Sequence, residues 1–177
     1  MTTACCRTPR KGFTIVELMV TVAVLGVLAA LALPAFGQLL ARQRVTAARG
    51  DLFATLMLAR SQALDLGQRV AVCPSADALT CRRDSRWEGG WLLFVDANFD
   101  RRRGPNEEIL RQGPLSTAVQ IRSNAGRPVV IFHPDGSAAG FNVTFSLCAI
   151  GLAEPARQLI VSNAGRLRSD EGARCAV

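Results

Sequence analysis

The feature that most constrains this chain is an apolar segment near its N-terminus. Residues 13–33 contain one ionisable side chain, that of Glu17. A run of about 20 apolar residues is long enough to cross the hydrocarbon layer of a membrane as a helix. A carboxylate inside such a run is costly in lipid, so Glu17 is a candidate functional residue. Three cations and no acid precede the run. This pattern keeps the N-terminus in the cytoplasm and sends the rest of the chain across the membrane.

Three interpretations of this segment compete. The first is an ordinary secretory signal, with a small-residue cleavage site at residues 30–32 after the apolar run. The second is a plain single-span anchor. The third is a signal that is cut ahead of the run, because residues 11–18 (Lys-Gly-Phe-Thr-Ile-Val-Glu-Leu) closely resemble the motif of prepilin peptidase substrates. That motif has a glycine before the cut, an aromatic residue after it and a glutamate at the fifth processed position. An ordinary signal has no use for Glu17 in its apolar region, which favours the third interpretation.

The resemblance to type IV prepilins implies a processing step and a mode of assembly. Prepilin peptidase would remove residues 1–12 by cutting between Gly12 and Phe13, and the new amine of Phe13 would be N-methylated. The apolar helix would hold the subunit in the inner membrane until it joins a filament. Its partners would be other major and minor pilins and the inner-membrane assembly platform. Glu17 would then be neutralised by the N-terminal amine of a neighbouring subunit, because an unpaired buried charge is costly.

The pattern after the apolar segment predicts that the same helix continues to about Leu66. Apolar residues recur there at spacings of three and four, which indicates one buried stripe. The stripe consists of Ala48, Leu52, Leu56, Ala59, Ala63 and Leu66. Gly67 is expected to end the helix. We therefore assign residues 13–36 to a transmembrane or filament-core helix and residues 37–66 to its amphipathic second half.

From Arg69 onward the sequence predicts β-strands. Short runs rich in β-branched and aromatic residues are separated by glycine, proline and asparagine. These runs are residues 70–73, 91–95, 109–110, 119–121, 129–132, 141–147 and 159–161. Residues 67–177 are expected to form a β-rich globular domain. The fold class is α+β, with the long N-terminal helix packed on an antiparallel β-sheet.

Four cysteines remain once the leader is removed, namely Cys73, Cys81, Cys148 and Cys175. An even number in a segment that faces an oxidising compartment favours two disulfides over a metal site. Three pairings are possible. We favour Cys73–Cys81, which closes a short turn, and Cys148–Cys175, which ties down the C-terminus. The close Cys-x-x-Cys spacing of zinc sites does not occur among these four cysteines, so no metal is expected.

The processed chain as a whole resembles a minor pilin or pseudopilin of the GspH/FimT branch, with its type IV pilin-like fold. Besides the signal, the resemblance rests on residues 59–63 (Ala-Arg-Ser-Gln-Ala), 72–75 (Val-Cys-Pro-Ser), 91–100 and 132–136 (Phe-His-Pro-Asp-Gly). It implies a low-abundance subunit at or near a filament tip that helps to start assembly. Such a subunit resides first in the inner membrane, with its C-terminal domain in the periplasm, and then in the extracellular pilus.

A short basic element near the C-terminus suggests a more specific function. Residues 165–168 (Gly-Arg-Leu-Arg) resemble a Gly-Arg-x-Arg element that is associated with DNA binding in FimT-type pilins of naturally transformable bacteria. On a strand, Arg166 and Arg168 would share one face, and Arg157 and Arg174 flank them in the sequence. Such arginines would bind phosphates without reading sequence, and salt would weaken the binding steeply. Asp170 and Glu171 follow directly and oppose this interpretation.

Other candidate sites have weaker support. Residues 96–107 begin like a calcium loop, but Arg101 replaces the usual glycine and two more arginines follow, which opposes cation binding. These arginines and Arg82, Arg83 and Arg86 form a second basic cluster, which we interpret as a solvated loop. His133 precedes a Pro-Asp-Gly turn, and no recognisable arrangement of nucleophile, base and acid accompanies it. We expect no enzyme activity and no cofactor.

Three functional hypotheses remain. The first is a minor pilin of a type IV pilus that supports assembly and DNA uptake. The second is a minor pseudopilin of a type II secretion system. The third is a membrane-anchored DNA receptor that never enters a filament.

Overall fold

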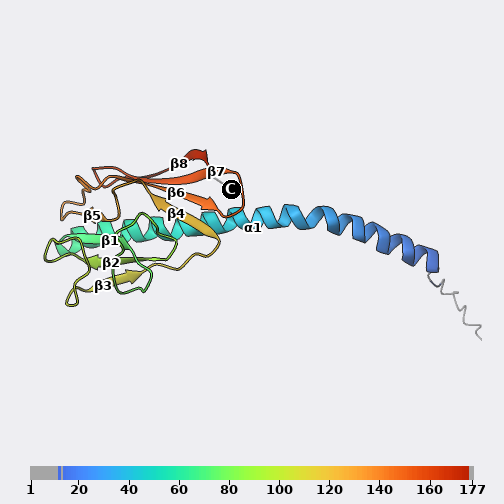
Figure 1. The fold of residues 1–177 in the computed structure, drawn as a ribbon, viewed down its shortest axis with the longest axis horizontal. Coiled ribbons are helices and arrows are strands. Elements are labelled where there is room, and N and C mark those ends of the chain that lie inside the picture. The colour runs from blue at the N-terminus through green and yellow to red at the C-terminus, as the bar shows by residue number, and fades with distance from the viewer. Residues whose placement is uncertain (1–11, 13, 176–177) are drawn as a thin grey trace, which may run out of the picture. The chain divides into compact units, whose positions relative to one another are not determined.

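A computed structural model describes Gly12 and residues 14–175. The expected leader residues 1–11 and Phe13, the proposed new N-terminus, lie outside the described residues. The chain divides into two compact units, Met1–Gln38 and Leu39–Val177, and each is described by itself (Figure 1).

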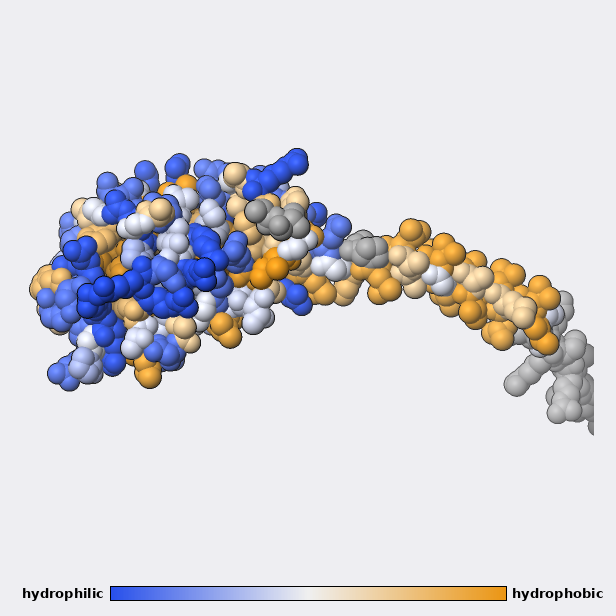
Figure 2. Space-filling view, viewed as in Figure 1, coloured by the Kyte–Doolittle hydropathy of each residue, from blue (hydrophilic) through white to orange (hydrophobic). Residues whose placement is uncertain are grey.

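The first unit consists of the N-terminal part of helix α1, which runs from Ile15 to Leu66. Thr14 caps the N-terminus of the helix: its Oγ1 accepts a hydrogen bond from the Glu17 amide at 3.2 Å. Every described side chain from Thr14 to Leu33 is exposed. Figure 2 shows that this segment is mainly apolar. By length and composition, α1 is the one helix among the described residues that could cross a membrane.

The second unit contains the amphipathic part of α1, which ends at Leu66 and is followed by Gly67 with a φ of 63°. Its buried apolar residues are Val45, Leu52, Leu56, Ala59 and Ala63, and Thr55 is buried beside them. The predicted stripe is therefore confirmed from Leu52 to Ala63. The expected burial of Leu66 is wrong: its side chain is 44% exposed, because the helix ends there and the chain turns away at Gly67.

The eight strands of the described residues confirm the expected antiparallel β-sheet domain and form two sheets. The first, sheet A, has the order β3-β2-β1-β5. Its strands are β1 (Val70–Pro74), β2 (Trp91–Val95), β3 (Ile109–Gln112) and β5 (Val130–Phe132). The second, sheet B, has the order β4-β6-β7-β8. Its strands are β4 (Val119–Ser123), β6 (Val143–Ala149), β7 (Pro155–Val161) and β8 (Leu167–Arg174). The list of predicted strands lacks β8, because an exposed, charged edge strand has no apolar run.

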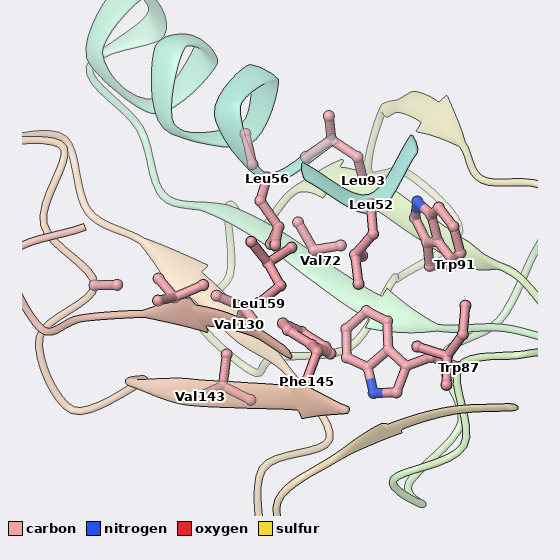
Figure 3. Packing of buried hydrophobic residues seen from close by; sticks show 14 of the residues in the cluster. Leu52, Leu56, Val72, Trp87, Trp91, Leu93, Val130, Val143, Phe145 and Leu159 are labelled. Atoms are coloured by element: carbon pink, nitrogen blue, oxygen red, sulfur yellow. The ribbon is translucent and has the colours of Figure 1, made fainter. Parts of the chain in front are cut away.

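The main core lies where α1 and the two sheets meet (Figure 3). The rings of Trp87 and Phe145 pack edge to face, with their centroids 4.8 Å apart. Trp91 is buried and donates a hydrogen bond from Nε1 to Oγ1 of Thr55 at 3.1 Å. A tryptophan buries a large apolar area but its N–H still needs a partner. Thr55 supplies that partner from the buried face of α1.

A second, smaller apolar cluster involves sheet A and the loops around it. Its buried members are Ala71, Cys73, Leu92, Phe94 and Ile131. Every residue of β1 and β2 is buried, which means that both faces of these strands are covered. Both predicted disulfides are present: Cys73–Cys81 closes the loop after β1, and Cys148–Cys175 ties the end of β8 to β6.

Candidate functional site

Three segments that carry the sequence resemblance meet at one point of the second unit. Arg60 of α1 donates a hydrogen bond from Nε to the carbonyl oxygen of Gly136 at 2.9 Å. Gly165 lies against the same carbonyl, since a Cβ added to Gly165 would be 2.0 Å from the Gly136 oxygen. Gly165 also has a φ of 70°, a conformation that glycine adopts without steric cost. The glycine of the basic element is therefore required by packing.

The hairpin between β7 and β8 carries Arg166 and Arg168, the central pair of the basic element. The amide of Arg166 donates to Oγ of Ser162 at 3.2 Å, which fixes the turn just before β8. Arg168 lies within β8, opposite Ile160 of β7. Leu167 between them packs partly against the core, and both arginines are exposed. Neither forms an ion pair with any residue that the structure describes.

The two flanking arginines differ from this pair. Arg157 of β7 forms an ion pair with Glu171, its cross-strand neighbour in β8. Arg174 is exposed at the far end of β8. It lies six positions after Arg168, which corresponds to roughly 20 Å along a strand. Arg157 and Arg174 therefore remain candidate phosphate contacts, but Arg157 has a counter-charge and Arg174 lies well along β8 from Arg168.

The loop that resembles a calcium site uses its acids to hold its own backbone. Glu107 accepts hydrogen bonds from the amides of Ala97 and Gly104 at 3.0 and 2.8 Å. Asp96 accepts one from the Arg101 amide at 3.2 Å and lies 3.1 Å from the Arg69 guanidinium. Burial raises the pKa of Asp96 above its usual value. These interactions give the acidic residues a structural role in shaping the turn.

The residues expected to act in processing and assembly, Gly12 and Glu17, lie just before α1 and in its first turn. Gly12 and Glu17 are exposed, and Glu17 is the acidic residue of the first helical turn. A carboxylate there interacts favourably with the positive end of the helix dipole. The cleavage and methylation expected at Phe13 fall outside the described residues.

Two family models match the chain. The model described as type II transport protein GspH matches residues 48–165, and the model described as a prokaryotic N-terminal methylation motif matches residues 7–33. The chain belongs to the GspH family and carries a prokaryotic N-terminal methylation motif. The predicted family is thereby confirmed.

Individual relatives agree with this family. The chain is 32% identical to the pilin-like protein PilA1 of Thermus thermophilus over 167 residues, which cover 90% of this chain and 97% of that protein. It is 43% identical to a fimbrial protein of Pseudomonas aeruginosa over 131 residues, which cover 74% of this chain and 71% of the other. The fold is similar to that of the type IV minor pilin FimU of P. aeruginosa. That comparison has a TM-score of 0.60 and 21% identity, and covers 76% of this chain and 97% of FimU. The predicted pilin-like α+β fold is confirmed.

Proposed function

We propose that this GspH-family chain is a minor subunit of a type IV pilus. Residues 13–36 anchor it in the inner membrane, the domain lies in the periplasm, and the subunit enters the filament at or near its tip to help start assembly. The observation that supports this most is the contrast within α1. Its N-terminal part exposes every described apolar side chain from Ile15 to Leu33, whereas its C-terminal part is packed into a domain core.

The exposed apolar part of α1 is stable only where its side chains contact an apolar environment instead of water. Lipid would provide that environment before assembly, and the helices of other pilins would provide it inside a filament. Glu17 is the one ionisable group of this part. In lipid or in a helical bundle, its charge is stable only with a partner. The N-terminal amine of a neighbouring subunit, set free by cleavage before Phe13, has the charge and the position to be that partner.

Replacement of Glu17 tests the assembly role. We expect Glu17→Gln to leave prepilin cleavage and membrane insertion intact, and to remove the subunit from sheared filaments. Thr21→Val is a matched control, because Thr21 is a polar residue of the same helix whose hydroxyl bonds only to the Leu18 carbonyl. Incorporation of Glu17→Gln at the wild-type level would contradict the proposal. Recovery in secretion pseudopili instead of pili would identify a type II secretion pseudopilin.

DNA binding by the hairpin is a second candidate function. The guanidiniums of Arg166 and Arg168 favour it, because they are exposed and form no ion pair with a described acid. Phosphates would bind there without sequence preference. We expect Arg166→Gln with Arg168→Gln to abolish low-salt retention of DNA by the full chain in non-ionic detergent. Arg44→Gln with Arg49→Gln removes the same charge from α1 and should retain DNA. Unchanged retention by the hairpin variant would refute this function. Retention together with failure to enter filaments would indicate a membrane-anchored receptor.

A further inference from the structure

A groove of about 630 Å³ lies among four loops of the second unit, at residues 80–83, 100–103, 126–129 and 140–141. Its volume is within the range of about 300 to 1,000 Å³ that is typical of ligand sites. Six of its lining residues are arginines and one is an acid, Asp100. We call it the arginine groove. The arginines are Arg82, Arg83, Arg101, Arg102, Arg103 and Arg127.

Most arginines of the groove have no acidic partner among the described residues, although Arg103 and Arg127 donate hydrogen bonds to the carbonyl oxygens of Pro105 and Gly140. Arg82 is paired with Asp84, but the other five arginines of the groove form no ion pair within the described part of the chain. The carboxylate of Asp100 is already used by the loop, because it accepts hydrogen bonds from the Arg102 amide at 2.7 Å and from the Asn98 side chain at 3.0 Å. Adjacent guanidiniums that lack counter-charges repel one another, so an anion bound between them is favoured.

The loop backbone holds one of these arginines in an uncommon conformation. Arg101 has a φ of 65°, a region that is costly for a residue with a Cβ. The buried carboxylate of Asp96 maintains this turn through the Arg101 amide. Glycine would adopt the same backbone at lower cost. The backbone conformation therefore does not explain why an arginine occupies this position, whereas its side chain does. That side chain lines the groove, and its guanidinium carbon lies 5.9 Å from the ring centre of Phe141.

The groove and the β7–β8 hairpin are connected by a short segment. The amide of Phe141, which lines the groove, bonds to the carbonyl of Ala138 at 2.9 Å, and the amide of Ala138 bonds to the carbonyl of Asn163 in the hairpin at 2.9 Å. Three residues span at most about 11 Å. One extended polymer could therefore contact the groove and Arg166 together, which a small anion could not.

We propose that the arginine groove binds the phosphate backbone of a single nucleic-acid strand. Arginine forks match phosphate geometry, and a basic groove with an aromatic wall is typical of sites that bind single strands without sequence preference. The strand continues past Ala138 to the hairpin. This inference rests on the nucleic-acid role proposed above, but its residues are different. It replaces the sequence-based interpretation of these arginines as a solvated loop.

The test measures binding of a labelled oligodeoxythymidine to the full chain in non-ionic detergent as salt is varied. The groove variant is Arg83→Gln with Arg101→Gln and Arg102→Gln, which leaves the hydrogen bonds of the loop in place. We expect it to weaken low-salt binding by at least about tenfold and to reduce the slope of log K against log salt by about 2, since each lost phosphate contact contributes about 0.7. The charge-matched control, Arg44→Gln with Arg49→Gln and Arg86→Gln, should bind like the wild type.

The outcomes separate this inference from the hairpin function. If the hairpin variant loses binding and the groove variant binds like the control, the proposal for the groove is overturned and the proposal for the hairpin stands. Loss in the groove variant alone supports the groove and refutes the hairpin. A wild-type chain that does not bind the oligonucleotide overturns both. Groove-dependent binding of poly-glutamate without binding of the oligonucleotide also overturns the proposal, because the ligand would then be an acidic peptide.

Discussion

Gly165 and Gly136 lie in such close contact that a Cβ on Gly165 would be 2.0 Å from the Gly136 carbonyl oxygen. The same oxygen accepts the hydrogen bond from Nε of Arg60. The end of α1, the turn after β5 and the hairpin before β8 are therefore joined at one carbonyl group. The position of Arg166 and Arg168 on the surface depends on this junction.

We expect Gly165→Ala to destabilise the fold strongly. A residue with a Cβ costs roughly 1–2 kcal/mol in the left-handed region, and the overlap with the Gly136 oxygen adds about 1–3 kcal/mol. Gly126→Ala separates the two effects, because Gly126 has a φ of 75° but open space around it. Thermal unfolding of the full chain in detergent, followed by tryptophan fluorescence, measures the difference. If both variants lost the same stability, the contact between Gly165 and the Gly136 oxygen would add no cost beyond that of the backbone conformation.

The hydrogen bond of Thr55 to Trp91 predicts a contrast between two substitutions. Thr55→Val keeps the shape of the side chain but leaves the buried Trp91 N–H without an acceptor, which costs about 1–3 kcal/mol. Thr55→Ser retains the hydroxyl and should lose less stability. Denaturant unfolding measures both. If Thr55→Ser lost as much as Thr55→Val, packing of the methyl group and not the hydrogen bond would account for the effect.

Removal of the Cys148–Cys175 disulfide is expected to loosen the end of β8. The bridge joins residues 27 apart in the sequence, and closure of such a loop contributes about 3.6 kcal/mol through the entropy of the unfolded chain. The Cys148→Ala, Cys175→Ala variant should show faster amide exchange in β8 than the wild type, with β1 less affected. The Cys73→Ala, Cys81→Ala variant should show the reverse pattern. Uniform acceleration in both variants would mean that the domain unfolds as one unit.

Asp77 predicts a loss of stability in acid. Hydrogen bonds, first from the Thr80 hydroxyl and then from backbone amides, hold the pKa of Asp77 well below its ordinary value of 3.8. Because the folded pKa is the lower one, the stabilisation is complete above about pH 4 to 5 and disappears as the pH falls further. Asp77→Asn should flatten the decline of the unfolding midpoint below pH 4, whereas Glu108→Gln, a change at an exposed acid, should not. If the unfolding midpoint of Asp77→Asn fell below pH 4 as steeply as that of the wild type, other groups would account for the loss of stability in acid.

Much of this protein is predictable from local pattern. The apolar run with Glu17, the stripe from Leu52 to Ala63 and seven of the strands follow from hydropathy and its period, which depend on neighbouring residues. The sequence left three disulfide pairings open, and the one favoured for its short turn and its tied C-terminus is the one present. The exposure of Leu66 was missed, because a stripe does not reveal where its partner surface ends.

The functional surface depends on contacts between distant segments. The sequence groups Gly165 with two arginines proposed to bind DNA because it is adjacent to them, but its packing against Gly136, 29 positions earlier in the sequence, accounts for the glycine. Arg157 was expected to contribute charge, and pairing with Glu171 across β7 and β8 offsets it. Loops far apart along the chain bring Arg83, Arg101 and Arg127 into one groove. Hydropathy and charge order are properties of the chain itself, whereas the neighbours of a guanidinium or a carbonyl exist only once strands and loops have packed.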